Sequence, residues 1–284
     1  MNGFINVLKP VGATASDVVQ CVKYALHEKV GHLGTLDPGA AGVLPVAVGQ
    51  GTKLFNFLTN KVKYYRAYFT FGVTTDTLDS YGVVTEQSAI LPTWGALLEA
   101  LKGFVGVIEQ IPPNYSAISV GGVRAYTLAR KGVDVQLKTR LVEVYSFELI
   151  EQKSANTFVV DIRCSGGTYI RSLARDVAEA CGTVGYMSAL IRLQSGCFKI
   201  EDAYALDEIR EQKTACVLPL DYPLSDVDEY VFDDARYDDI DFGRRVRCDN
   251  FDGYRKIYCK DTFFGLGKCK DGFLDLEYYL KNAF

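Results

Sequence analysis

This chain of 284 residues has few of the groups on which the commonest catalytic machineries depend. Its only histidines are His27 and His32, which excludes a His-rich metal site and disfavours metal catalysis. Because the two lie within six residues of each other, and because no GxSxG elbow occurs, a hydrolase with a Ser-His-Asp triad is also disfavoured. The segment GQGTK at 49–53 lacks the GxxxxGKS/T spacing, so no P-loop is predicted.

Long apolar runs and paired cysteines are missing as well. No apolar stretch reaches the ~18 residues that a membrane span needs. The N-terminal MNGFINVLKPVG is interrupted too soon to be a signal peptide. The eight cysteines are scattered with no CxxC pair, which fits buried thiols in a reducing compartment. The sequence therefore predicts a cytoplasmic protein with no membrane segment.

What the chain does contain is an ordinary globular composition with an uneven charge distribution. It is 48% hydrophobic and 23% charged, enough to bury a core in one large domain or in one domain with a small appendage. The net charge is −4, but residues 201–241 hold fourteen acids and three bases, a local −11. Residues 1–70 and 244–284 are mildly basic. We interpret the acidic stretch as a solvated surface, and the basic flanks leave room for a polyanionic partner.

Local patterns predict an α+β fold. Helices are expected at 16–26, which begins with Ser16 as the N-cap, and at 93–104, which is capped by Thr93. The remaining expectations are strands at 64–72, 141–150 and 157–164, a short strand leading into a helix across 166–182, and a small β appendage at 244–284. Strands and helices do not alternate, so a mixed, largely antiparallel sheet is predicted.

The stretch GHLGTLDPGAAGVL, at 31–44, contains the most unusual carboxylate, Asp37. An Asp-Pro-Gly sequence suits a tight turn in which the Asp side chain bonds local amides, and that interpretation needs no function. The functional interpretation is that small neighbours let a bulky ligand approach the backbone, with Asp37 serving as nucleophile or base in a partly dry pocket. Both interpretations remain open on spacing alone.

Three further residues are candidates for the same pocket. A carboxylate that stays ionised in a dry site needs a cation, and Arg171 in GTYIRS is a candidate, although a helix-surface role is the simpler interpretation. Tyr65 and Tyr169 could stack on a base, since aromatic side chains next to basic residues suit nucleic-acid recognition. Alternatively, the aromatic strand around Tyr65 simply faces the core.

The stretch around Asp37 resembles the signature of the TruB family, the tRNA pseudouridine-55 synthases. The resemblance continues in order through most of residues 3–200, in the blocks LKPVGATASDVV (8–19), KYYRAYFTFGVTTDTLDSYG (63–82), GFVGVIEQIPPNYSAISVGGVRAYTLARKG (103–132), RCSGGTYIRSLARDVA (163–178) and LIRLQSGCF (190–198). The tail resembles, more weakly, a reduced form of the RNA-binding module that bacterial members carry at their C-terminus.

The resemblance implies a pseudouridine synthase domain at 1–225, followed at 226–284 by an acidic linker and a small PUA-like module. It implies isomerisation of uridine 55 in the T loop of tRNA, without cofactor or metal, by a monomer. Catalytic roles would fall to Asp37, Tyr65 and Arg171. Substrate-binding positions would be His32, which fills space around the everted nucleotide, Tyr169, Leu190 in the apolar wall, and Lys9 in the first block.

The chemistry within this resemblance stays open. Asp37 would attack the sugar carbon or the ring, or would abstract a sugar proton, while the base is flipped out of the loop. Two other functions are alternatives: a non-catalytic RNA-binding protein that helps tRNA to fold, and a guide-dependent pseudouridine synthase within a ribonucleoprotein. Retention of Asp37, Tyr65 and Arg171 argues against the first, and the compact tail without basic extensions argues against the second.

Overall fold

The computed structural model describes residues 1–116, 119–120, 123–124 and 137–281. Its main element is a nine-stranded sheet with the order β1-β3-β12-β4-β11-β10-β7, to which β2 adds at β3 and β13 at β12. Within the described part of the chain its neighbours are antiparallel except for β3 and β12. The strands are β1 (Gly3–Lys9), β2 (Val30–His32), β3 (Ala40–Val48), β4 (Lys63–Phe71), β7 (Gly106–Gln110), β10 (Arg140–Gln152), β11 (Thr157–Cys164), β12 (Gly185–Ser195) and β13 (Phe198–Lys199).

The expected α+β class with a mixed, largely antiparallel sheet is therefore confirmed. Two small hairpins accompany the sheet, one of β5 (Val73–Thr75) and β6 (Val84–Gln87), the other of β8 (Ser119–Val120) and β9 (Val123–Arg124). The family block at 103–132 lies partly outside the described residues.

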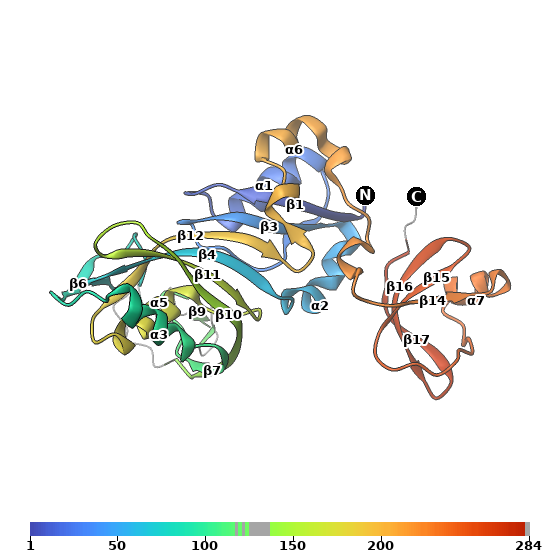
Figure 1. Cartoon of the computed structure of the whole chain (residues 1–284). Coiled ribbons are helices and arrows are strands. Elements are labelled where there is room, and N and C mark those ends of the chain that lie inside the picture. The colour runs from blue at the N-terminus through green and yellow to red at the C-terminus, as the bar shows by residue number, and fades with distance from the viewer. Residues whose placement is uncertain (117–118, 121–122, 125–136, 282–284) are drawn as a thin grey trace.

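The helices are short. Among the described residues, the α-helices are α1 (Ala15–Leu26), α2 (Phe55–Thr59), α3 (Trp94–Lys102), α5 (Ile170–Ala180), α6 (Leu206–Gln212) and α7 (Tyr237–Asp241). The 3-10 helices are η1 (Gly49–Leu54), η2 (Ile200–Asp202), η3 (Lys213–Cys216), η4 (Tyr222–Leu224) and η5 (Asp234–Arg236). Figure 1 shows α1 and α6 together at the β1–β3 end of the sheet, and α3 and α5 at its β7–β10 end. No helix in the described ranges is long and apolar enough to cross a membrane.

Two local predictions were wrong. The N-cap of α1 is Thr14 rather than Ser16, because the Thr14 hydroxyl accepts from the amide of Asp17 while the Asp17 carboxylate accepts from the amide of Thr14. The expected short strand between Gly166 and α5 is not formed; residues 166–167 form a turn instead. A Cβ on Gly166 would lie 2.4 Å from the carbonyl oxygen of Thr59, so this turn depends on glycine to approach the end of α2.

The tail forms a separate four-stranded sheet with the order β14-β15-β16-β17. These strands are β14 (Glu229–Phe232), β15 (Arg255–Cys259), β16 (Thr262–Lys270) and β17 (Phe273–Tyr279). The predicted β appendage at 244–284 is thus present, but its first strand comes from the acidic stretch and pairs in parallel with β15. A local charge count cannot reveal this pairing, because β14 and β15 meet only in the folded chain.

Three apolar clusters hold these parts together. The largest fills the space between the main sheet and its helices, and includes Leu44, Phe69, Phe158 and Leu173. A second cluster joins the tail to the main sheet, since Leu266 and Leu280 pack with residues such as Phe4 and Leu33. The third lies inside the tail sheet around Phe264. The two sheets are set apart in Figure 1, yet they share buried surface.

Candidate active site

A cavity of about 510 Å³ opens where β4 and β12 meet the turn after β2 and the start of α5. Its walls include five residues singled out from the sequence, Asp37, Tyr65, Tyr169, Arg171 and Leu190. Asp37 and Arg171 are 134 positions apart in the chain. The volume lies within the ~300–1,000 Å³ range of small-molecule sites in proteins. This cavity is the candidate active site.

Residues 37–40 form the tight turn that the Asp-Pro-Gly sequence predicts, but without the expected bonds from local amides to the Asp37 side chain. The carbonyl oxygen of Asp37 accepts a bond of 3.0 Å from the amide of Ala40, which closes a turn over Pro38 and Gly39. The ring of Tyr81 packs closely on Gly39, since a Cβ there would lie 2.5 Å from it and the ring would have to shift. The Asp37 side chain does not bond the turn's own amides but reaches Arg171. The turn therefore directs the Asp37 carboxylate toward Arg171 and the cavity.

Arg171 lies in the first turn of α5 and is 5% exposed, so the helix-surface interpretation is wrong. Its Nε lies 2.9 Å from Oδ2 of Asp37 and its Nη2 lies 3.2 Å from Oδ1, a two-point contact. Its remaining donors reach the carbonyl oxygens of Thr77 and Tyr115 at 2.9 and 3.0 Å. With every edge engaged, the guanidinium fixes the orientation of the Asp37 carboxylate.

A second carboxylate, Asp79, shares this arginine. Its Oδ2 lies 3.5 Å from Nη1 of Arg171. Burial raises the pKa of Asp37 above its ordinary value and Asp79 adds to the rise, whereas the Arg171 guanidinium and Lys9 lower it. The Asp37 side chain keeps 35% exposure on the cavity side, where a substrate would sit. An ionised carboxylate with a raised pKa is a stronger base and nucleophile than an ordinary one.

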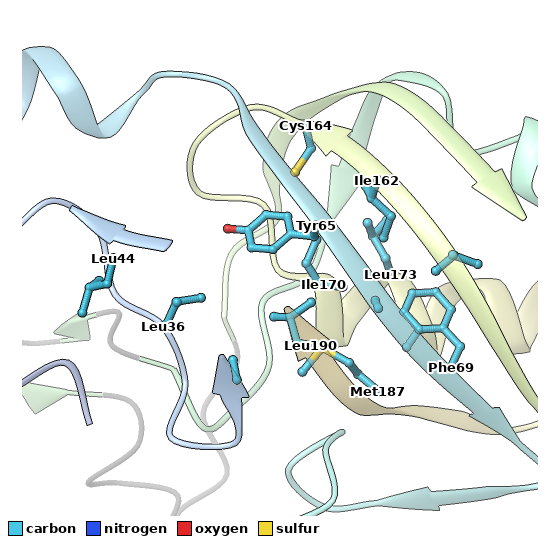
Figure 2. Close-up of a cluster of buried hydrophobic side chains, with 14 of the residues drawn as sticks. Leu36, Leu44, Tyr65, Phe69, Ile162, Cys164, Ile170, Leu173, Met187 and Leu190 are labelled. Atoms are coloured by element: carbon cyan, nitrogen blue, oxygen red, sulfur yellow. The ribbon is translucent and has the colours of Figure 1, made fainter. Parts of the chain in front are cut away.

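Tyr65 lies in the middle of the sheet on β4 and is 7% exposed. Figure 2 shows its ring among Leu36, Ile162, Ile170 and Leu190, with the hydroxyl pointing away from Phe69. Burial raises the pKa of Tyr65, so its hydroxyl stays protonated at neutral pH. Tyr65 is therefore at once a core residue and part of the cavity wall, and its stacking on a base stays a prediction.

Tyr169 precedes α5 and is held by its backbone. The side-chain amide of Gln110, which is fully buried on β7, accepts from the Tyr169 amide at 2.8 Å and donates to its carbonyl at 3.0 Å. The guanidinium carbon of Arg140 lies 4.7 Å from the centre of the Tyr169 ring. These contacts present the Tyr169 ring to the cavity at a fixed position.

Lys9 and His32 are near the cavity but are not among the residues that line it. Lys9 is fully buried, and its Nζ donates to the carbonyl oxygens of Pro10 and Ala13 at 2.9 and 2.6 Å, with Pro38 at 3.4 Å. It thereby ties the loop after β1 to the Asp37 turn. His32 ends β2, and burial lowers its pKa. The substrate-binding roles of both stay predictions.

Sequence reasoning missed three residues that build the site: Asp79, Gln110 and Arg192. Arg192 is 1% exposed, and its Nε donates at 2.6 Å to the carbonyl oxygen of Val43 while its other nitrogens lie 3.4 Å from the carbonyls of Thr35 and Gly34. It therefore braces the segment before Asp37. The alternation of strand side chains could have found Arg192, since it lies two positions after Leu190.

Comparison with known proteins gives the family of the chain. A family model described as TruB family pseudouridylate synthase (N terminal domain) matches residues 23–170, and one described as tRNA pseudouridylate synthase B C-terminal domain matches residues 171–225. The fold resembles a crystal structure titled as a Cbf5-Nop10-Gar1 complex, with a TM-score of 0.75 and 25% identity over 98% of this chain and 84% of that one. The fold is that of the pseudouridine synthases.

The chain belongs to the TruB family, and it is a pseudouridylate synthase. It is 41% identical over 249 residues to a protein of Alkaliphilus oremlandii named tRNA pseudouridine synthase B, covering 87% of this chain and 83% of that protein. It is 45% identical over 236 residues to a protein of the same name from Caldanaerobacter subterraneus subsp. tengcongensis, covering 81% and 82%.

Proposed function

We propose that this chain isomerises uridine 55 in the T loop of tRNA to pseudouridine, acting alone and without a cofactor. The observation that carries the proposal is the Asp37 carboxylate, held at 2.9 Å by a buried arginine at the wall of a cavity of nucleoside size. A binding protein gains nothing from such a carboxylate, which would repel phosphate. The tRNA substrate is supported by the names of the relatives at 41% and 45% identity.

The reaction we propose begins when the target uridine leaves its stack and enters the cavity. Asp37 acts as nucleophile or base while the bond from N1 of uracil to C1′ of the sugar breaks. Uracil then rotates, C5 bonds to C1′, C5 loses its proton and N1 gains one. Nothing is oxidised or reduced. Tyr65 and the Leu190 wall would hold the uracil ring during its rotation, and Arg171 would keep Asp37 oriented.

The tail supports a second contact with RNA. Its exposed Arg245 and Arg247 flank the buried Val246, and their guanidinium carbons lie 3.6 and 5.8 Å from the centre of the Phe273 ring. We propose that residues 226–284 form a module that reaches a part of the tRNA distant from the T loop, while residues 1–225 form the catalytic domain. The separate sheet and the apolar cluster around Phe264 favour this division. We further propose that the enzyme is monomeric and cytoplasmic.

The test is to incubate the purified chain alone with an unmodified tRNA transcript and to map pseudouridine by chemical modification and primer extension. We expect one pseudouridine, at position 55. A transcript with cytidine at position 55 is the control and should give none. Absence of product with intact binding would instead favour a tRNA-folding protein. Product formed only after a guide RNA is added would favour the guide-dependent alternative.

A further inference from the structure

The cavity contains a lysine that the proposed chemistry does not use. Lys63 is the first residue of β4, 4% exposed, and it lines the same cavity as Asp37 and Tyr65. Within the described part of the chain, its buried Nζ has no hydrogen-bond partner. A buried ammonium without partners is costly, so a position of this kind calls for an explanation.

The groups that face Lys63 do not balance its charge. Cys164 on β11 and Ser195 on β12 are its register partners, and Arg192 on β12 adds a second positive charge. The nearby Lys61 already pairs with Asp226 at 2.6 Å. Burial lowers the pKa of Lys63 to about 7; Arg192 and Lys61 add to this lowering, whereas Cys164 opposes it.

We propose that Lys63 is the binding site for one phosphate of the RNA backbone beside the everted nucleotide. Asp37, oriented by Arg171, would then act on the reacting nucleoside, and Lys63 would anchor the strand next to it. This inference rests on the proposed function for the identity of the RNA.

A phosphate is favoured because it supplies the full negative charge that this end of the cavity lacks. The lysine stem has four rotatable bonds, so its ammonium can move to the cavity surface without moving β4. Thr59 and Asn60 also line this cavity and offer a hydroxyl and an amide donor for the remaining oxygens. Binding would protonate Lys63, because a phosphate stabilises the charged form.

The first test measures tRNA binding against pH for the wild type, Lys63→Met and Lys61→Met. Loss of a charged hydrogen bond predicts about tenfold weaker binding for Lys63→Met near pH 7. The difference in tRNA affinity between the wild type and Lys63→Met should narrow as pH rises toward 9. Calorimetry in buffers of different ionisation heat measures the protons taken up when tRNA binds. At pH 8, Lys63→Met should take up close to one proton fewer than the wild type. Lys61→Met, the control, should keep the proton uptake of the wild type; equal uptake by all three proteins would overturn the proposal.

The second test finds the phosphate. T-arm hairpins with a single neutral methylphosphonate at successive positions near the target uridine are bound to Asp37→Asn protein, with and without the additional Lys63→Met substitution. We expect one position at which methylphosphonate weakens binding severalfold when Lys63 is present and has no effect when Lys63→Met is added. If no position shows this coupling, Lys63 has only a structural role.

These outcomes are separable from failure of the proposed function. A wild-type enzyme that forms pseudouridine at position 55 but shows no coupling at any phosphate would overturn the Lys63 inference alone. Coupling and proton uptake in a protein that forms no pseudouridine would overturn the proposed reaction and leave the phosphate site standing. A wild type that binds no RNA would overturn both.

Discussion

Arg171 and Lys63 are buried cations on the walls of one cavity, and they differ in what surrounds them. Arg171 has a carboxylate at 2.9 Å, a second at 3.5 Å and two backbone carbonyls. Lys63 has no hydrogen-bond partner among the described residues. A buried charge with a full set of partners is fixed and can position a reacting group, whereas one without partners destabilises the free protein and favours a ligand that supplies the missing charge.

The largest loss of activity should come from removing the charge of Asp37, the carboxylate that Arg171 binds. Asp37→Asn keeps the shape of the side chain but leaves no nucleophile or base, so product formation should fall below a few per cent of the normal rate while tRNA binding persists. Single-turnover assays together with a binding titration check this. Asp79→Asn is the matched control and should retain more activity, because Asp79 lies farther from Arg171 and lines no part of the cavity. Rapid turnover by Asp37→Asn would remove Asp37 from the chemistry.

Changing the cation itself should have the next largest effect. Arg171→Lys keeps the charge but loses the two-point contact with Asp37, and we expect kcat to fall about 100-fold with a much smaller change in KM. Arg175→Lys, one turn along α5, is the control, since Arg175 pairs with its neighbour Asp176 rather than with Asp37. Equal effects of the two substitutions would mean that Arg171 acts only through helix stability.

Tyr65 lies on the same strand as Lys63 and contacts the cavity, so its variants separate stacking from proton transfer. Stacking is worth ~1–3 kcal/mol per base, so Tyr65→Ala should weaken binding about tenfold or more while Tyr65→Phe binds normally. If the hydroxyl transfers a proton, Tyr65→Phe should bind normally yet turn over slowly. Identical binding and rates for the two variants would refute a stacking role.

The contrast between the two cations also predicts a stability difference in the absence of RNA. The pKa of Lys63 is about 7 in the folded chain against an ordinary 10.5, so between these values the unfolded chain binds more protons and the stability of the wild type rises with pH. Lys63→Met should therefore be more stable than the wild type near pH 7, by more than the ~1.4 kcal/mol that one pKa unit represents.

The stability difference between Lys63→Met and the wild type should shrink as pH approaches about 10, where the lysine of the unfolded chain also loses its proton. Urea unfolding of both proteins across this range measures it, and Lys61→Met should show no such gain because Lys61 is paired with Asp226. A Lys63→Met protein less stable than the wild type at neutral pH would mean that Lys63 has a partner after all.

The smallest effect on tRNA binding should come from substituting exposed cations. Arg245→Gln with Arg247→Gln removes two exposed charges from the tail, and each lost phosphate contact should reduce the slope of log K against log salt by roughly 0.7–0.9. Binding of whole tRNA at different salt concentrations measures this, with turnover of a saturating T-arm hairpin as the control that should not change. A salt slope equal to that of the wild type would exclude a tail contact with phosphate through these arginines.

The sequence alone determined a good part of this protein. Alternating and capped segments predicted β4, α3, β10 and β11, because these elements depend on local propensity and on a single buried face. The motif around Asp37 and the blocks that follow it identified the family. Pro38 and Gly39 also indicated the turn, since proline fixes a φ that suits a turn and glycine tolerates turn conformations that other residues avoid.

Only the tertiary structure decided which charges meet. Asp37 and Arg171 are 134 residues apart, and the sequence pattern of α5 allowed Arg171 to face solvent as readily as the cavity. The parallel pairing of β14 with β15 and the shared arginine contact of Asp79 likewise depend on segments brought together by the sheet. Lys63 could be read from sequence only as one of several basic residues near Tyr65. Its burial without a partner follows from the packing of β11 and β12 on either side of β4, because desolvation is a property of the folded surroundings and not of the residue.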